Sequence, residues 1–300
     1  MTEIEVAMQH LKIQTEDKFS LAARHYPAAG KARAIVLMPT AMGVKQDYYG
    51  DFAAYLAEQG FAVVSFDYRG MGASIPAQHQ HSLRGFEADL LTWAEQDYSA
   101  ALRHAKQSYP DLPLFVIGHS LGGQLAGLTP AHDLIDGMIT VGSGLGYWRE
   151  NAQALRRKVW LLWYFLVPLY LRMFGYFPGK KLRKVGNLPK GVMQQWSHWC
   201  RHPAYFVDKQ GAALATRHHT MAIPILALSF TDDEMMGPGN IRALLAYYSQ
   251  AEIEHRNIAP VQIAARRIGQ MGFFRREFQH SLWSQALEWL HSQSRQYAQK

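Results

Sequence analysis

The residues whose types and spacing most clearly suggest chemistry are Gly118-His119-Ser120-Leu121-Gly122, a G-x-S-x-G pattern. It follows the apolar run at 114–117 and precedes residues 124–127, which can form a helix. A serine on so sharp a strand-to-helix turn has strained backbone angles, and glycine neighbours avoid clashes within the turn. Its hydroxyl then stands clear of the sheet, with a helix N-terminus beneath it. The pattern predicts that Ser120 is a nucleophile.

A nucleophilic serine that attacks a carbonyl needs two backbone N–H groups at the place where the negative oxygen forms. Leu121, directly after the nucleophile, is expected to supply one of them. The other is expected from the loop Pro39-Thr40-Ala41-Met42-Gly43, which follows an apolar run ending at Met38. Because a backbone N–H does not depend on the side chain, either Ala41 or Met42 can serve as this donor.

The chain resembles the α/β-hydrolases, and more narrowly bacterial hydrolases of the serine aminopeptidase and monoglyceride lipase branch. The resemblance covers nearly the whole chain. It rests on the turn around Ser120 and on Phe66-Asp67-Tyr68-Arg69-Gly70-Met71-Gly72-Ala73-Ser74, which matches the family's D-x-R-G-x-G-x-S turn. Asp67 and Arg69 in such a turn are expected to be structural. The resemblance implies a serine hydrolase that cleaves an ester or related acyl bond of a hydrophobic molecule or lipid, without a cofactor.

A triad acid is expected after the strand at 225–229, where Thr231-Asp232-Asp233-Glu234 stands. Its role is to orient the base and to stabilise the imidazolium that forms. The spacing typical of the family favours Asp233. Asp232 and Glu234 remain alternatives, and three adjacent acids could also form a solvated turn.

The resemblance places the triad histidine where this chain has Gln270. An amide cannot accept the proton of Ser120 at any accessible pH. In a well-studied serine protease, loss of the base alone lowers turnover about 10⁶-fold. Three explanations remain open: His280 or His255 could substitute as the base, the chain could be a non-catalytic binding protein, or the base could have been removed by substitution.

Apolar runs alternate with helical patterns at intervals of 20–30 residues, which predicts an α/β fold with a mostly parallel, doubly wound sheet. Two extended segments near the start predict a hairpin that turns at Glu16-Asp17-Lys18. Strands are predicted at 34–38, 61–66, 114–117, 137–141, 225–229 and 253–258, and helices at 48–59, 86–108, 240–249 and 277–292. The pattern breaks between about 146 and 217. We therefore predict a core formed by 1–145 and 218–300, interrupted by a helical cap at 146–217.

The predicted cap carries the charge excess of the chain. The net charge is +7, but residues 149–190 contain ten basic residues and one acidic residue, so the rest is −2. The apolar run at 159–171 is shorter than the roughly 20 residues that cross a bilayer, and Pro168 is expected to interrupt it. A cap helix packed on the core is the favoured interpretation, and the alternative is a lid lining an acyl pocket. Trp160, Trp163 and Tyr164 are candidate substrate contacts. The flanking basic residues could dock on anionic lipid: Arg156, Arg157, Lys158, Lys180, Lys181, Arg183 and Lys184.

Several classes of function are disfavoured by composition. The single cysteine, Cys200, cannot form an internal disulfide, a CxxC redox pair or a thiolate zinc site. No metal cluster or phosphate loop is evident, and the basic charge lies among aromatic residues without a nucleic-acid motif. Residues 1–6 lack the pattern of a signal peptide. These features predict a cytoplasmic protein, at most peripheral to a membrane, that needs neither a metal nor nucleic acid.

Overall fold

A computed structural model describes residues 7–182, 185–207 and 209–299. In this part of the chain, eight strands form one sheet in the order β1-β2-β4-β3-β5-β6-β7-β8. The strands β1 and β2 pair antiparallel, β2 pairs antiparallel with β4, and the pairs from β4 through β8 are parallel. The bounds are β1 Gln9–Gln14, β2 Ser20–Tyr26, β3 Ala34–Pro39, β4 Phe61–Phe66, β5 Leu114–His119, β6 Gly137–Val141, β7 Pro224–Phe230 and β8 Glu252–Ile258.

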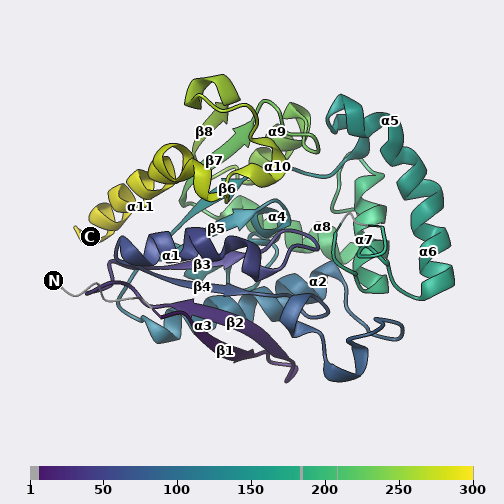
Figure 1. Cartoon of the computed structure of the whole chain (residues 1–300), viewed down its shortest axis with the longest axis horizontal. Coiled ribbons are helices and arrows are strands. Elements are labelled where there is room, and N and C mark those ends of the chain that lie inside the picture. The colour runs from purple at the N-terminus through teal and green to yellow at the C-terminus, as the bar shows by residue number, and fades with distance from the viewer. Residues whose placement is uncertain (1–6, 183–184, 208, 300) are drawn as a thin grey trace.

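Helices cover both faces of this sheet (Figure 1). Because side chains alternate along a strand, Ile35 and Leu37 of β3 join one apolar cluster, and Val36 and Met38 join the other. The second cluster also takes residues of α1 (Gly50–Glu58) and α11 (Ser284–Tyr297). The first takes residues of the run α2 (Leu90–Thr92), η4 (Trp93–Tyr98) and α3 (Ser99–Ser108), and of α9 (Pro238–Tyr247). The fold is therefore the predicted doubly wound α/β arrangement.

Short helical turns complete the core. They are η1 Gln46–Tyr49, η2 Gly72–Ser74, η3 Ala77–His79, α4 Leu121–Leu125, η5 His132–Leu134, η8 Thr216–Thr220, η9 Pro260–Ile263, α10 Gly269–Gly272, η10 Arg276–Phe278 and η11 Gln279–Trp283. The helix predicted at 86–108 begins four residues late, at Leu90. The carboxylate of Asp89 explains this start, because it accepts a hydrogen bond of 2.7 Å from the N–H of Thr92 and so caps the helix.

Residues 146–217 are helical or irregular wherever the structure describes them, apart from one isolated antiparallel bridge between Phe177 and Leu188. The elements are η6 Trp148–Glu150, α5 Gln153–Leu161, η7 Leu162–Leu166, α6 Val167–Phe174, α7 Lys190–Cys200 and α8 Lys209–Ala215, with η8 at the end. Pro168 does not interrupt the helical path, which corrects the sequence expectation. It lies in the first turn of α6 after the π-helical turn η7, where a missing N–H is tolerated. No helix in the described ranges is long and apolar enough to cross a membrane.

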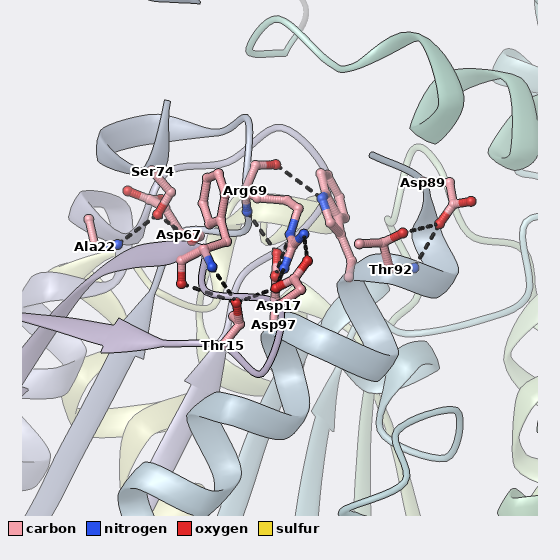
Figure 2. A network of polar contacts seen from close by, with 11 residues as sticks. Thr15, Asp17, Ala22, Asp67, Arg69, Ser74, Asp89, Thr92 and Asp97 are labelled. Atoms are coloured by element: carbon pink, nitrogen blue, oxygen red, sulfur yellow. Dashed lines mark hydrogen bonds and ion pairs between the residues drawn. The ribbon is translucent and has the colours of Figure 1, made fainter. Parts of the chain in front are cut away.

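A buried polar network supports the turn after β4 (Figure 2). The Arg69 side chain lies between two acids: its Nε donates to Asp97 at 2.7 Å, and its Nη2 donates to Asp17 at 2.9 Å. The Asp67 carboxylate accepts hydrogen bonds from the N–H groups of Gln46 and Ala73, each at 2.9 Å. These contacts join the first hairpin, the turn after β4 and η4. Neither Asp67 nor Arg69 lines the cleft beside Ser120, as expected for structural residues.

Candidate active site

Ser120 stands on a sharp turn between β5 and α4. Its backbone has φ 51° and ψ −111°, a conformation that an L-residue rarely adopts. The turn is tight enough to require glycine on both sides. A Cβ on Gly118 would lie 2.6 Å from the nitrogen of Gly123, and one on Gly122 would lie 2.5 Å from the carbonyl oxygen of Pro39. The G-x-S-x-G pattern is thus a steric requirement of this turn.

Ser120 opens onto a cleft of about 540 Å³. One wall is the loop from Ala41 to Lys45, and another is the segment from Glu234 to Met236. The segment 146–217 contributes Val185, Gly186 and Trp196, and the lining also includes Leu121, Gln124, Gln270 and Met271. The lining is mostly apolar around a few polar groups, which is typical of a site for a small hydrophobic ligand.

The structure distinguishes the two expected oxyanion donors in the loop after β3. The N–H of Ala41 already donates to the buried hydroxyl of Tyr49 at 2.9 Å. The N–H of Met42 has no hydrogen-bond partner among the described residues. Leu121 is the first residue of α4, where a helix leaves its N–H groups unpaired. Leu121 and Met42 therefore have N–H groups available at this cleft.

The three adjacent acids after β7 have different partners. Asp232 accepts hydrogen bonds from the N–H groups of Ile268 (2.8 Å) and Gly269 (3.1 Å), one on each oxygen. Glu234 accepts from the N–H of Gln270 at 3.1 Å and lies 3.2 Å from Arg267. Asp232 and Glu234 thus hold the loop that carries residue 270.

Asp233 is the acid with a free oxygen. Its Oδ1 accepts from the N–H groups of Met235 (2.7 Å) and Met236 (2.9 Å), while its buried Oδ2 has no partner among the described residues. Burial raises the pKa of Asp233 to about 7, the two backbone N–H groups oppose that rise, and the neighbouring acids add to it. An unpaired carboxylate oxygen is where a triad acid would receive the ring N–H of a histidine.

Gln270 is buried and lines the same cleft as Ser120. Its Nε2 donates to the carbonyl oxygen of Gly142 at 2.9 Å, and its Oε1 has no hydrogen-bond partner in the described chain. Gln270 and Asp233 therefore each leave one buried acceptor oxygen unpaired. Neither side chain makes a hydrogen bond to Ser120 in the described structure.

The two alternative bases, His255 and His280, do not line the Ser120 cleft. His255 bonds through Nε2 to the hydroxyl of Ser229 at 2.8 Å and lines a separate cavity of about 550 Å³ that also borders Asp233. His280 is exposed on η11 and does not line the Ser120 cleft. His119 does line it, but both ring nitrogens are bonded, to Tyr49 and to the carbonyl of Gln270. Burial lowers the pKa of His119 to about 4.

The three cap aromatics predicted as substrate contacts do not line the cleft. Trp160 and Tyr164 are exposed, whereas Trp163 is buried and packs edge-on against Trp196 with ring centroids 5.0 Å apart. Trp196 itself lines the cleft, a role that sequence reasoning missed because its segment has the composition of cap core. In the described ranges, no group of three His, Cys, Asp or Glu residues could hold a metal ion.

Comparisons with known proteins concern the family and the fold. The family model of serine aminopeptidase, S33, matches residues 30–190, which include Ala41, Met42, Ser120 and Leu121 but neither Asp233 nor Gln270. A Dictyostelium discoideum relative, named an uncharacterized abhydrolase domain-containing protein, is 34% identical over 112 residues. That match covers 37% of this chain and 11% of the relative, so the chain spans only a small part of that protein's length.

Two solved structures illustrate the shared fold. A thermostable carboxyl esterase from Bacillus coagulans has a TM-score of 0.66 at 16% identity, covering 96% of this chain and 99% of its own. A soluble variant of monoglyceride lipase from Saccharomyces cerevisiae has a TM-score of 0.64 at 15% identity, covering 98% and 99%. At these identities the likeness concerns the fold alone. Since the family model spans more than half of the chain and includes the Ser120 turn, the chain belongs to the serine aminopeptidase, S33, family of α/β-hydrolases.

Proposed function

We propose that this protein is a serine hydrolase that acts on an ester of a hydrophobic molecule, with turnover limited by the amide at position 270. The observation that carries the proposal is the position of Ser120. Its backbone is strained, and it opens onto a mostly apolar cleft that also contains Leu121 and Met42, the residues with available N–H groups. Met42, Trp196 and Met235 give the cleft walls that suit an acyl chain. The names of the esterase and the lipase that share this fold are consistent with this substrate class.

In the proposed reaction, Oγ of Ser120 bonds to the acyl carbon, and the carbonyl electron pair moves onto its oxygen. The N–H groups of Leu121 and Met42 stabilise that oxygen. The alkoxide then leaves as the carbonyl re-forms, and water later releases the acid from Ser120 by the same route. The hydroxyl proton of Ser120 passes to water, because both ring nitrogens of His119 are already bonded and Gln270 is an amide. The departing alkoxide takes its proton from water. Both steps are therefore slow.

A second candidate is a non-catalytic protein that binds the same hydrophobic molecule. The unpaired oxygens of Asp233 and Gln270 favour it, because a histidine at 270 would satisfy the former and the glutamine does not. The apolar cleft persists without any catalytic step. Both candidates make the same contacts with the substrate and differ only in whether Ser120 reacts.

The test is hydrolysis of nitrophenyl esters of increasing acyl length by the full chain, Ser120→Ala, Gln270→His and the double variant. We expect slow, Ser120-dependent turnover by the unmodified chain. Gln270→His should raise turnover by at least 100-fold, because a positioned base contributes typically 10²–10⁴-fold. The double variant Ser120→Ala/Gln270→His, which has the base but lacks the nucleophile, should show no turnover.

The same measurement separates the two candidates. A silent unmodified chain that gains activity with Gln270→His supports the binding protein. Turnover that survives Ser120→Ala contradicts Ser120 as the nucleophile. If Gln270→His folds normally by circular dichroism and hydrolyses none of the esters, the hydrolase proposal is wrong.

A further inference from the structure

The helical run α5–η7–α6 exposes large apolar side chains on its outer face, defined here as the cap face. This segment runs along one outer edge of the molecule, at the right of Figure 1. Six large apolar residues of the run are between 43% and 58% exposed. They are Trp160, Leu161, Tyr164, Phe165, Leu169 and Met173. Elsewhere in the described chain, the only exposed large apolar residues are Val261 and Tyr297.

The opposite side of the same run already packs on the protein. Val159, Trp163, Val167 and Leu171 are at most 5% exposed and recur every four residues, as the buried stripe of a helix does. The run is therefore apolar on both sides. Such a helix is expected to be covered on its outer side as well. Among the described residues, the Arg201 guanidinium lies over the Tyr164 ring, 5.4 Å from its centroid, yet all six apolar side chains stay at least 43% exposed.

Basic side chains border the cap face. Arg156, Arg157 and Lys158 are exposed in α5, and Arg172 is exposed in α6. None of the four forms a salt bridge in the described chain. Lys180 and Lys181 are also exposed, whereas the predicted contributions of Arg183 and Lys184 lie outside the described residues. Only Glu150 opposes this charge between residues 149 and 190.

An apolar aromatic face with a cationic border matches a helix that lies in the plane of a bilayer surface. Tyrosine and tryptophan favour the headgroup level, and arginine and lysine extend toward lipid phosphates. A protein partner without a negative surface would not neutralise these basic residues, which form no salt bridge in the described chain.

We propose that the cap face docks the protein on an anionic lipid bilayer. Trp160, Tyr164 and Phe165 enter the headgroup region, and the basic border contacts lipid phosphates. Trp163, on the inner side of the same helix, packs against Trp196 of the Ser120 cleft. Docking would therefore place the cleft next to a source of hydrophobic molecules. The proposal goes beyond ester hydrolysis and holds whether or not Ser120 turns over substrate.

The experiment is co-sedimentation of the full chain with phosphatidylcholine vesicles, with or without phosphatidylserine, at low and high salt. We expect binding only to the anionic vesicles, weakened by salt. The triple variant Arg156→Gln/Arg157→Gln/Lys158→Gln should lower affinity by roughly 100-fold, since each basic residue near the surface contributes about fivefold. Phe165→Ser/Leu169→Ser should also lower it, because the apolar contact is lost.

The matched control is Lys12→Gln/Lys31→Gln/Arg295→Gln, which removes three exposed charges elsewhere. It should leave binding within a few-fold of the unmodified chain. An equal loss in this control would show attraction by net charge alone and overturn the proposal. The absence of sedimentation with anionic vesicles at low salt would do the same.

Two further outcomes would assign the cap face to another partner. A concentration-dependent dimer that disappears in Phe165→Ser/Leu169→Ser, without vesicle binding, would show that a second copy covers it. Binding to single-stranded RNA that needs the basic border and ignores the apolar substitutions, again without vesicle binding, would indicate a nucleic-acid surface. Each result contradicts the membrane proposal, and circular dichroism confirms that the variants remain folded.

Discussion

The buried carboxyl of Asp233 makes the stability of this protein depend on pH. Burial raises its pKa from 3.8 to about 7, so the folded state holds a proton that the unfolded chain releases. This contribution is complete below about pH 4 and is lost as pH rises through 7. The loss is at most about 4 kcal/mol, because each tenfold difference in proton affinity between the folded and unfolded states corresponds to about 1.4 kcal/mol.

Asp233→Asn removes this titration and leaves an oxygen for the N–H groups of Met235 and Met236. We expect the variant to gain stability relative to the unmodified chain as pH rises from 5 to 8. Urea denaturation at several pH values measures the difference. Asp133→Asn, at an exposed position in η5, is the control and should show no such trend. If the stability difference between Asp233→Asn and the unmodified chain does not change with pH, Asp233 is ionised throughout this range.

Individual side chains show what the sequence could and could not predict. Ser120 was identifiable because its constraint is local: the turn itself demands glycine at fixed positions. The positions of Asp233 and Gln270 came from resemblance, and the partners of Asp232 and Glu234 lie in a loop 36 residues away. The bond from Ala41 to Tyr49 and the placement of Trp196 also arise from tertiary packing, which no local pattern encodes.

At the scale of elements, the first turn of the α2–η4–α3 run depends on its cap. Asp89 accepts from both the N–H and the hydroxyl of Thr92 at 2.7 Å. Asp89→Ala should lower the free energy of unfolding by about 1 kcal/mol, the usual cost of a lost cap. Asp89→Asn retains an acceptor and should be nearly neutral. Thermal denaturation of both variants tests this. Equal losses of stability in Asp89→Ala and Asp89→Asn would mean that the hydrogen-bond acceptor at position 89 does not stabilise the helix.

Elements were predictable where their apolar period is strong. The strands β3 to β7 are mostly apolar runs, whereas β8 is polar, and the predicted positions of all six are confirmed within two residues at each end. Predicted boundaries are less accurate where a side-chain contact sets the end of an element. The cap at Asp89, for example, starts its helix later than the spacing of apolar residues suggests. The effect of Pro168 was predicted wrongly, because a π-helical turn before the proline keeps the helical path continuous.

At the scale of the whole molecule, Arg69 links segments that lie far apart in the chain. Its partner Asp97 is fully buried, so Arg69→Met would leave a buried acid without its cation. We expect a loss of about 3–5 kcal/mol in the free energy of unfolding. Adding Asp97→Leu should recover part of that loss, because the unpaired acid is then gone. Urea denaturation of Arg69→Met, Asp97→Leu and the double variant measures this coupling, and purely additive effects would contradict it.

The loop that carries residue 270 is held through its main chain. Asp232, Glu234 and His119 bond to backbone groups of residues 268–270, and none of these contacts involves the side chain at 270. The loop should therefore keep its shape whichever residue stands there. Glutamine and histidine codons differ only at the third base. A single nucleotide change in the gene thus separates the present protein from one with an imidazole at this position, without any remodelling of the surrounding fold.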